Sequence, residues 1–181
     1  MFADDICVFC SSVHCLQRIP DVCQAYAESH GIIFNCNKTV CMTFKAESAR
    51  STATPVLKLG DQYVNSVDQY KYLGIVLDTE LSDDKDIQRQ LRYQYCAANK
   101  LQASFSRCTN AVKNVLFRSF STPMHASQLW CNFRKSCMQR LRVAYNFGCR
   151  ALYNLPWKTS VSSHQVHCNI PTFETLLRKY K

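Results

Sequence analysis

Two adjacent carboxylates stand near the start of the sequence, between short apolar runs. Asp4 and Asp5 follow Phe2 and Ala3 and precede the apolar residues 6–10. Apolar runs of this length predict buried strands, and an acidic pair between two of them predicts the tight turn of a hairpin. Carboxylates on such a turn suit Mg²⁺, which prefers hard oxygen ligands and can bind substrate phosphates at the same time. The pair therefore indicates a metal site for phosphoryl transfer, and the alternative is a solvated turn without a chemical role.

Two further segments follow this pair in a fixed order. The stretch from Asn35 to Thr39 contains Lys38 and separates residues 32–34 from residues 40–44, two runs that predict strands. Further along, residues 70–78 read YKYLGIVLD, which predicts one apolar strand. Together these segments predict an α+β arrangement in the first part of the chain.

In this order, the segments resemble the reverse transcriptase of non-LTR (LINE-type) retrotransposons. Residues 2–5 are similar to the metal-binding palm hairpin of that family, and Ala3 favours the LINE type over the retroviral type. Residues 35–39 are similar to the next palm motif. The residues similar to the primer grip, which precedes the thumb, are Tyr72, Leu73 and Gly74. The resemblance covers residues 1–80 by motif, and the rest of the chain by position and composition.

The resemblance implies RNA-directed DNA polymerisation, with an RNA template, a DNA primer and deoxynucleotides as partners. Asp4 and Asp5 would help to hold two Mg²⁺ ions. Lys38 would assist the departure of pyrophosphate, and the alternative is a surface lysine on a turn. The family places a further metal-binding Asp on an earlier palm strand and also has fingers, and this sequence starts in the middle of the palm. We therefore expect a fragment that is inactive by itself.

Charge divides the chain near residues 81–85. The net charge is +9, and residues 1–84 carry six Lys and Arg against eleven Asp and Glu, whereas residues 85–181 carry sixteen against two. The division predicts two functional regions, one that could bind metal ions and one that could bind a polyanion. The resemblance implies that they are a partial palm of antiparallel strands and a helix over residues 1–80 and a basic, all-helical, thumb-like region over residues 81–181. A solvated basic face without a partner is the alternative.

The boundary coincides with the start of a predicted helix. Ser82 is a suitable N-cap, and the aspartates that follow place negative charge at the positive end of the helix dipole. Helical spacing predicts one packed face, made of Ile87, Leu91, Tyr95, Ala98, Leu101 and Phe105. The basic residues expected on the other face, to follow the template and primer backbone, are Arg89, Arg92, Lys100 and Arg107.

Several other elements can be predicted. Ser12 begins a helix that Gly31 ends, and Pro20 inside it predicts a kink or a break. A second helix after Asn110 is expected to turn Val112, Val115, Leu116 and Phe120 inward and Lys113 and Arg118 outward. Trp130 and Tyr145 are expected in the core, and a short helix is expected from Thr172.

The remaining features concern location and metals. No apolar run is long enough to span a bilayer and no secretory signal is present, so we expect a nuclear or cytoplasmic protein. In that compartment the twelve cysteines are expected to be reduced and mostly small core residues. His164, His167 and Cys168 form a candidate zinc cluster without the regular spacing of such sites.

Two other classes of protein stay open. One is a non-enzymatic module whose basic helices bind RNA or DNA without sequence preference. The other is a translated remnant that folds poorly, because a palm without its other strands leaves an exposed sheet edge that invites aggregation.

Overall fold

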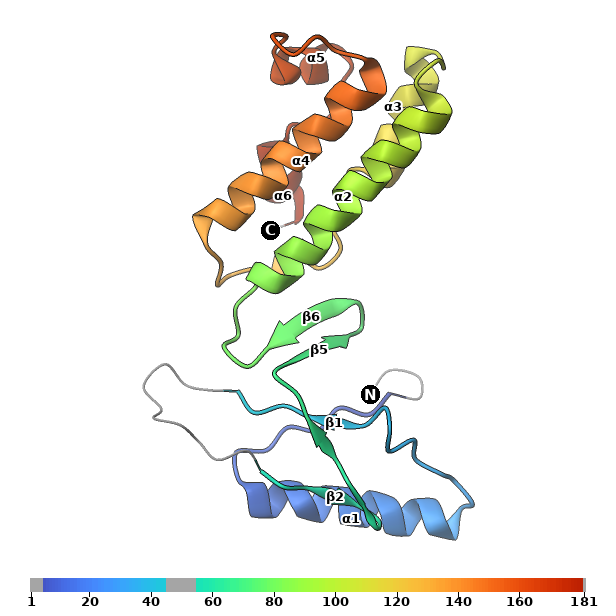
Figure 1. Ribbon diagram of the computed structural model, residues 1–181, viewed down its shortest axis with the longest axis vertical. Helices are drawn as coiled ribbons and strands as arrows, with labels where there is room; N and C mark the ends of the chain where they lie inside the picture. The colour runs from blue at the N-terminus through green and yellow to red at the C-terminus, as the bar shows by residue number, and fades with distance from the viewer. Residues whose placement is uncertain (1–4, 45–54, 181) are drawn as a thin grey trace. The chain divides into compact units, whose positions relative to one another are not determined.

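The computed structural model describes residues 5–44 and 55–180, which form small sheets and helices in two compact units (Figure 1). Unit 1 consists of Met1–Tyr70 with Asp78–Glu80, and unit 2 of Lys71–Leu77 with Leu81–Lys181. Asp4 lies outside the described residues. The mixture of helices and short strands agrees with the predicted α+β class.

The main helix of unit 1 is α1 (Val13–Ser29). Its N-cap is Ser12, as predicted, and the chain leaves the helix through Gly31 at a φ of 64°. Pro20 lies inside α1 without ending it, so of the predicted kink or break the structure excludes the break. A proline removes one intrahelical hydrogen bond, and the turns on either side of Pro20 supply the others. Ala27 is the buried residue of α1.

The strands of unit 1 are two residues long. β1 (Val40–Cys41) pairs in parallel with β4 (Asn65–Ser66), and β2 (Lys58–Leu59) pairs in antiparallel fashion with β3 (Gln62–Tyr63). The parallel pair differs from the antiparallel strands expected of a palm.

The strands predicted at residues 6–10 and 32–34 are wrong, and that predicted at 40–44 is reduced to β1. Neither of the first two runs forms a ladder with another described segment, and both are largely exposed, with Ile33 94% accessible. A strand requires a neighbour for its backbone N–H and C=O groups, so apolar character alone does not produce one.

The apolar stretch 70–78 forms a hairpin rather than one strand. β5 (Gln69–Tyr72) and β6 (Ile75–Asp78) pair across a turn at Leu73 and Gly74. Both turn residues have positive φ, 47° and 84°. Two consecutive positive φ values are typical of the tight turn that matches the twist of a two-stranded hairpin, and glycine adopts them readily.

Unit 2 is built on helices α2 (Asp84–Phe105) and α4 (Lys135–Tyr153), which run side by side and parallel (Figure 1). The remaining helices are α3 (Asn110–Phe120), the short 3₁₀ helix η1 (Ser127–Leu129), α5 (Val161–His167) and α6 (Phe173–Tyr180). The two long helices pack closely at Gly148 of α4, where an added Cβ would lie at contact distance, 3.4 Å, from the Cβ of Ala98. The predicted helix from Thr172 is confirmed as α6.

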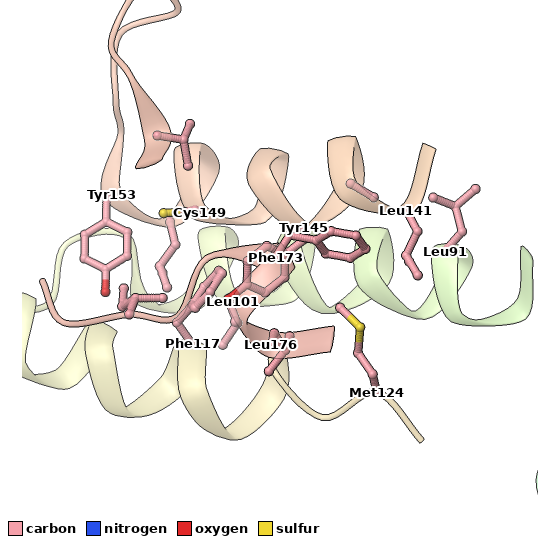
Figure 2. Close-up of a cluster of buried hydrophobic side chains, with 14 of the residues drawn as sticks. Leu91, Leu101, Phe117, Met124, Leu141, Tyr145, Cys149, Tyr153, Phe173 and Leu176 are labelled. Carbon is pink, nitrogen blue, oxygen red and sulfur yellow. The ribbon is translucent and has the colours of Figure 1, made fainter. Parts of the chain in front are cut away.

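The core of unit 2 lies between α2, α3, α4 and α6 (Figure 2). Tyr145 and Phe117 meet edge to face there, with ring centroids 5.3 Å apart. Trp130 and Tyr145 are buried, which confirms their prediction as core residues. Tyr95 and Phe105 are wrong as core residues, because both remain more than one-third exposed.

Helix α3 packs through a different face from the one predicted. Phe117 is fully buried and Lys113 is also buried, whereas Val112, Val115 and Phe120 are exposed. Leu116, predicted to face inward, packs half-buried against the core, and Arg118, predicted to face outward, is exposed. The ammonium group of Lys113 lies 5.8 Å from the centre of the Tyr153 ring, and this cation–π contact accommodates the charge inside the fold.

Two aspartates at the start of α2 fix the segment that leads into α4. Oδ2 of Asp83 accepts hydrogen bonds from the backbone N–H groups of Cys131 and Asn132, both at 2.7 Å. Oδ1 of Asp84 accepts from the N–H of Arg134 at 2.9 Å. These carboxylates therefore join the beginnings of the two long helices.

The twelve cysteines are all free thiols, and the prediction that most are core residues is wrong. Cys41 and Cys149 are buried, whereas Cys7, Cys10, Cys15, Cys96 and Cys131 are exposed and the others are half-buried. Burial raises the pKa of the Cys149 thiol to about 12, with the nearby Cys168 adding to the shift.

Candidate nucleic-acid interface

A buried carboxylate connects the β5–β6 hairpin to the helices of unit 2. Asp86, in the first turn of α2, is 1% exposed. Its Oδ1 accepts from the backbone N–H of Val76 at 3.0 Å and from Nε of Arg89 at 2.7 Å. Its Oδ2 accepts from Nε1 of Trp130 at 2.9 Å and from Nη2 of Arg89 at 3.2 Å. One carboxylate therefore holds the hairpin, its own helix and the segment after η1 together.

The electrostatics of Asp86 favour the charged form. Burial by itself raises the pKa of this carboxyl, but hydrogen bonds from Arg89, Val76 and Trp130, with the charge of Arg89, lower it by more. The resulting pKa lies below the ordinary value, so Asp86 is ionised at neutral pH.

The turn of the hairpin is held from a second side. Nε2 of His125 lies 3.2 Å from the carbonyl oxygen of Leu73 and forms a hydrogen bond with it. A Cβ added to Gly74 would lie 3.1 Å from the same nitrogen, so the ring packs directly on the glycine. Arg89 also donates through Nη2 to the carbonyl oxygen of His125, at 3.5 Å. The three predicted primer-grip residues, Tyr72, Leu73 and Gly74, thus lie at or beside a turn supported by unit 2.

The four predicted phosphate-binding residues are not equivalent. The side chain of Arg89 is 24% exposed and forms an ion pair with Asp86, so it supports the hairpin. Arg92 and Lys100 are exposed on α2, whereas Arg107 is exposed in the turn after the helix ends at Phe105, so its predicted place on the helix is wrong. Arg107 also lines an open hollow of about 620 Å³ at the C-terminal end of α2, with Asn99 and Gln102.

Acidic residues are missing from most of unit 2. The sequence contains no Asp or Glu between Asp86 and Glu174, so α3, α4, α5 and most of α2 carry none. Asp84, just before this stretch, forms an ion pair with Arg134 at 3.2 Å. Glu174, at its end, forms an ion pair with Arg142 at 3.3 Å. The helical surface is therefore positive and complementary to a polyanion.

The predicted magnesium ligands are only partly described. Asp5 is exposed and forms an isolated β-bridge, while Asp4 lies outside the described residues. Lys38 is exposed in a turn in which its N–H donates to the carbonyl oxygen of Asn35 at 3.1 Å. Within residues 5–44 and 55–180, no three side chains of the metal-binding types come together. The described residues therefore do not assemble a metal site.

The candidate zinc cluster brings two of its three residues together. Sγ of Cys168 lies 3.5 Å from Nε2 of His164, one helical turn away. Burial, and then the nearby His167, lower the pKa of His164. A structural zinc site needs four ligands, and the part of the chain that the structure describes offers no third ligand to this pair.

The sequence did not indicate Asp86, Trp130 or His125 as site residues. Asp86 was expected only to favour the helix dipole, and its spacing of three residues before Arg89 was the one local signal of an ion pair. The contacts to Val76 and Trp130 join positions far apart in the sequence, so no local pattern reports them.

Comparison with known proteins confirms the predicted resemblance to non-LTR retrotransposon polymerases. The chain is 25% identical, over 86% of its length, to the RNA-directed DNA polymerase from mobile element jockey of Drosophila melanogaster, of which it covers 18%. It is 25% identical, over 99% of its length, to the probable RNA-directed DNA polymerase from transposon BS of the same species, covering 21%. It is 22% identical, over 98% of its length, to the jockey polymerase of Drosophila funebris, covering 20%.

The chain thus spans about a fifth of the length of these curated relatives. No protein-family model matches it, and no solved structure matches it. No helix in the described part of the chain has the length and apolar character needed to cross a bilayer.

Proposed function

We propose that this chain is the end of the palm and a thumb-like region of a retrotransposon RNA-directed DNA polymerase. The observation that carries the proposal is the alignment of 86 to 99% of the chain with three polymerases of that name. Unit 1 and the β5–β6 hairpin would belong to the palm, and the helices of unit 2 would form the thumb-like region.

The helical region would bind the phosphates of the template and the primer. Arg92 and Lys100 are exposed on α2 and Arg107 is exposed in the turn after it, in a stretch of chain without acidic residues. Phosphate contacts of this kind position a nucleic acid without reading its sequence. Arg89 would contribute indirectly, because its guanidinium group is already bound to Asp86.

The turn at Tyr72, Leu73 and Gly74 would support the primer end. The hydrogen bond from His125 and the anchoring of Val76 by Asp86 hold this turn from two sides. A rigid support is what positioning of a reacting hydroxyl requires.

Catalysis would need residues from outside this chain. Asp4 and Asp5 would supply part of the ligand set for Mg²⁺, an ion that activates a primer hydroxyl and stabilises the leaving pyrophosphate when bound in an intact polymerase. Lys38 would assist the leaving group. Since the chain spans about a fifth of the length of its curated relatives, we predict that the purified 181-residue chain incorporates no nucleotide on a primed RNA template.

A chimera tests the polymerase proposal. The matching fifth of the Drosophila melanogaster jockey polymerase would be replaced by this chain, and incorporation of labelled nucleotide on a primed RNA would be measured. We expect Mg²⁺-dependent activity that Asp4→Ala and Asp5→Ala abolish. A soluble chimera that is inactive, or whose activity is indifferent to both substitutions, would contradict the proposal.

Phosphate binding by Arg92, Lys100 and Arg107 is tested on the 181-residue chain itself. The variant with Arg92→Gln, Lys100→Gln and Arg107→Gln should bind a labelled RNA–DNA duplex more weakly, and the slope of log affinity against log salt should fall by about 2 to 3. The matched control replaces Lys158, Arg178 and Lys179, which are also exposed in unit 2, with Gln. Equal losses from both triple variants would mean that total charge, rather than the positions of Arg92, Lys100 and Arg107, determines binding.

The second candidate function is a nucleic-acid-binding module without catalysis. The positive, acid-free surface of unit 2 favours it equally, because that surface requires no metal site. This candidate predicts salt-dependent binding by the chain together with an inactive chimera.

A further inference from the structure

We propose that the groove between α2 and α4 binds an unpaired base of a single-stranded nucleic acid. The groove is lined by Leu91, Tyr95, Gln139, Arg140 and Val143, and Phe147 lies beside it against Tyr95. This inference rests on the proposed nucleic-acid-binding role of unit 2 and adds a site for the base to the contacts with phosphates.

The groove combines an apolar floor with two accessible aromatic rings. The rings of Tyr95 and Phe147 are 5.6 Å apart between centroids and inclined by 54°, so they do not cover each other's faces. Their side chains remain 38% and 37% exposed although both helices are packed. Leu91, which also lines the groove, is buried.

The size of the groove limits its occupant. Its volume is about 160 Å³. Sites that enclose a whole small-molecule ligand have volumes of roughly 300 to 1,000 Å³. This groove is therefore suited to one flat ring, with the rest of the ligand outside.

The charges around the groove favour a nucleic acid over other partners. Arg140 lines it and Arg92 is exposed on α2 one turn before Tyr95. Across residues 5–44 and 55–180, the structure records no hydrogen bond or ion pair from either guanidinium group. Neither helix has an acidic residue after Asp86, so a second copy of this surface would be repelled.

Aromatic faces beside arginines are the typical arrangement for binding single strands. A base can stack on such a ring whatever its identity, while the arginines contact the flanking phosphates. Bases inside a duplex are stacked on each other and do not reach a groove of this size. The groove thus predicts a preference for single strands.

The experiment measures binding of the 181-residue chain to a fluorescein-labelled, twelve-nucleotide RNA by anisotropy. A second RNA carries 2-aminopurine at a central position, whose fluorescence falls on stacking, and a third carries abasic sugars in place of the central nucleosides. The variants are Tyr95→Leu and Phe147→Leu, which keep an apolar side chain, and Tyr95→Phe, which keeps the ring.

The matched control is Tyr93→Leu. Tyr93 lies on the same helix and is 43% exposed, but it points about 160° away from Tyr95 around the helix axis. Far-ultraviolet circular dichroism of each variant verifies that the helices are formed.

We expect Tyr95→Leu to raise the Kd roughly 5- to 150-fold and to remove the quenching of 2-aminopurine fluorescence. Tyr95→Phe and Tyr93→Leu should leave both almost unchanged, and the abasic RNA should bind as weakly to the wild type as the normal RNA binds to Tyr95→Leu. A DNA strand of the same sequence should respond to the substitutions in the same way, because a ring contacts either kind of base.

Equal binding of the abasic and normal RNAs, or equal effects of Tyr95→Leu and Tyr93→Leu, would overturn this inference while leaving phosphate binding by unit 2 intact. Absence of salt-dependent binding by the wild-type chain would instead remove the proposed binding role of unit 2 and this inference with it.

Discussion

Replacing Asp86 with Asn should destabilise unit 2 far more than an ordinary change of one carboxylate. The amide keeps the volume of the side chain but removes its charge, and its NH₂ group faces N–H donors where an acceptor is needed. Breaking a buried ion pair typically costs about 3 to 5 kcal/mol. Arg89 is 24% exposed and can recover some hydration, so we expect a loss of about 2 to 4 kcal/mol in the free energy of unfolding.

The assay is equilibrium unfolding in urea, followed by the far-ultraviolet signal of the helices. Asp84→Asn is the matched control, because Asp84 lies two residues before Asp86 on α2 and its ion-pair partner, Arg134, is exposed. An exposed ion pair contributes about 0 to 1 kcal/mol, although the bond from the Arg134 N–H adds to this. Asp86→Asn should therefore be clearly the more damaging of the two.

The pH dependence gives an independent readout. Because the pKa of Asp86 is lower in the folded chain than its ordinary value, the ionised carboxylate stabilises the fold above about pH 4. This stabilisation is lost as the pH falls through the folded pKa, and the Asn variant should lack that part of the acid transition. If Asp86→Asn costs no more than Asp84→Asn, or if both chains lose stability equally between pH 5 and pH 2, the assigned role of Asp86 is wrong.

Substitutions at three further positions test other parts of the structure. Gly74→Ala should destabilise the chain by about 1 to 2 kcal/mol in thermal unfolding, since φ is 84° and the new Cβ would lie 3.1 Å from His125, and a neutral effect would contradict the described turn. Gly148→Ala should stabilise α4 by up to about 1 kcal/mol, because its Cβ would make an ordinary contact at 3.4 Å. Gly148→Leu should be strongly destabilising, because the larger side chain does not fit between the two helices. Equal melting temperatures for the two variants would contradict the close packing. Pro20→Ala should increase helicity measured by circular dichroism, and a decrease would indicate that α1 depends on the proline.

Helices were predicted better than strands because their signals are local. The burial of Ile87, Leu91 and Leu101 follows from a spacing of three and four residues, and the N-cap, Asp83, lies one residue after the predicted Ser82. Residues 6–10 and 32–34 have equally clear apolar character, but whether they pair depends on segments elsewhere. Local composition cannot supply that information.

The two errors on helix faces have a different cause. In α3, the apolar residues lie on more than one side, so periodicity allowed several faces, and contact with Tyr153 and Tyr145 selected the one with Lys113 and Phe117. Tyr95 satisfies the apolar spacing of α2, but it lies at the edge of the face that meets α4 and keeps part of its ring in solvent. Residue spacing predicts which side chains share one face of a helix, but it does not predict which of them the neighbouring helix covers.

The candidate site was accessible from the sequence only in part. The order of the motifs and the division of charge were sufficient to indicate the polymerase relationship. The support of the hairpin was not, because Val76, Asp86, His125 and Trp130 come together only through the tertiary fold.

Because the buried cysteines lie in different units, chemical modification of their thiols would report how each unit opens. A thiol reagent applied briefly to the native chain should modify the exposed cysteines and spare Cys149, whose burial disfavours the reactive thiolate. Cys149 lies at the centre of unit 2 and Cys41 within unit 1, so mass spectrometry of these two positions would follow the opening of each unit separately. No engineered label is needed to learn which of the two units opens first.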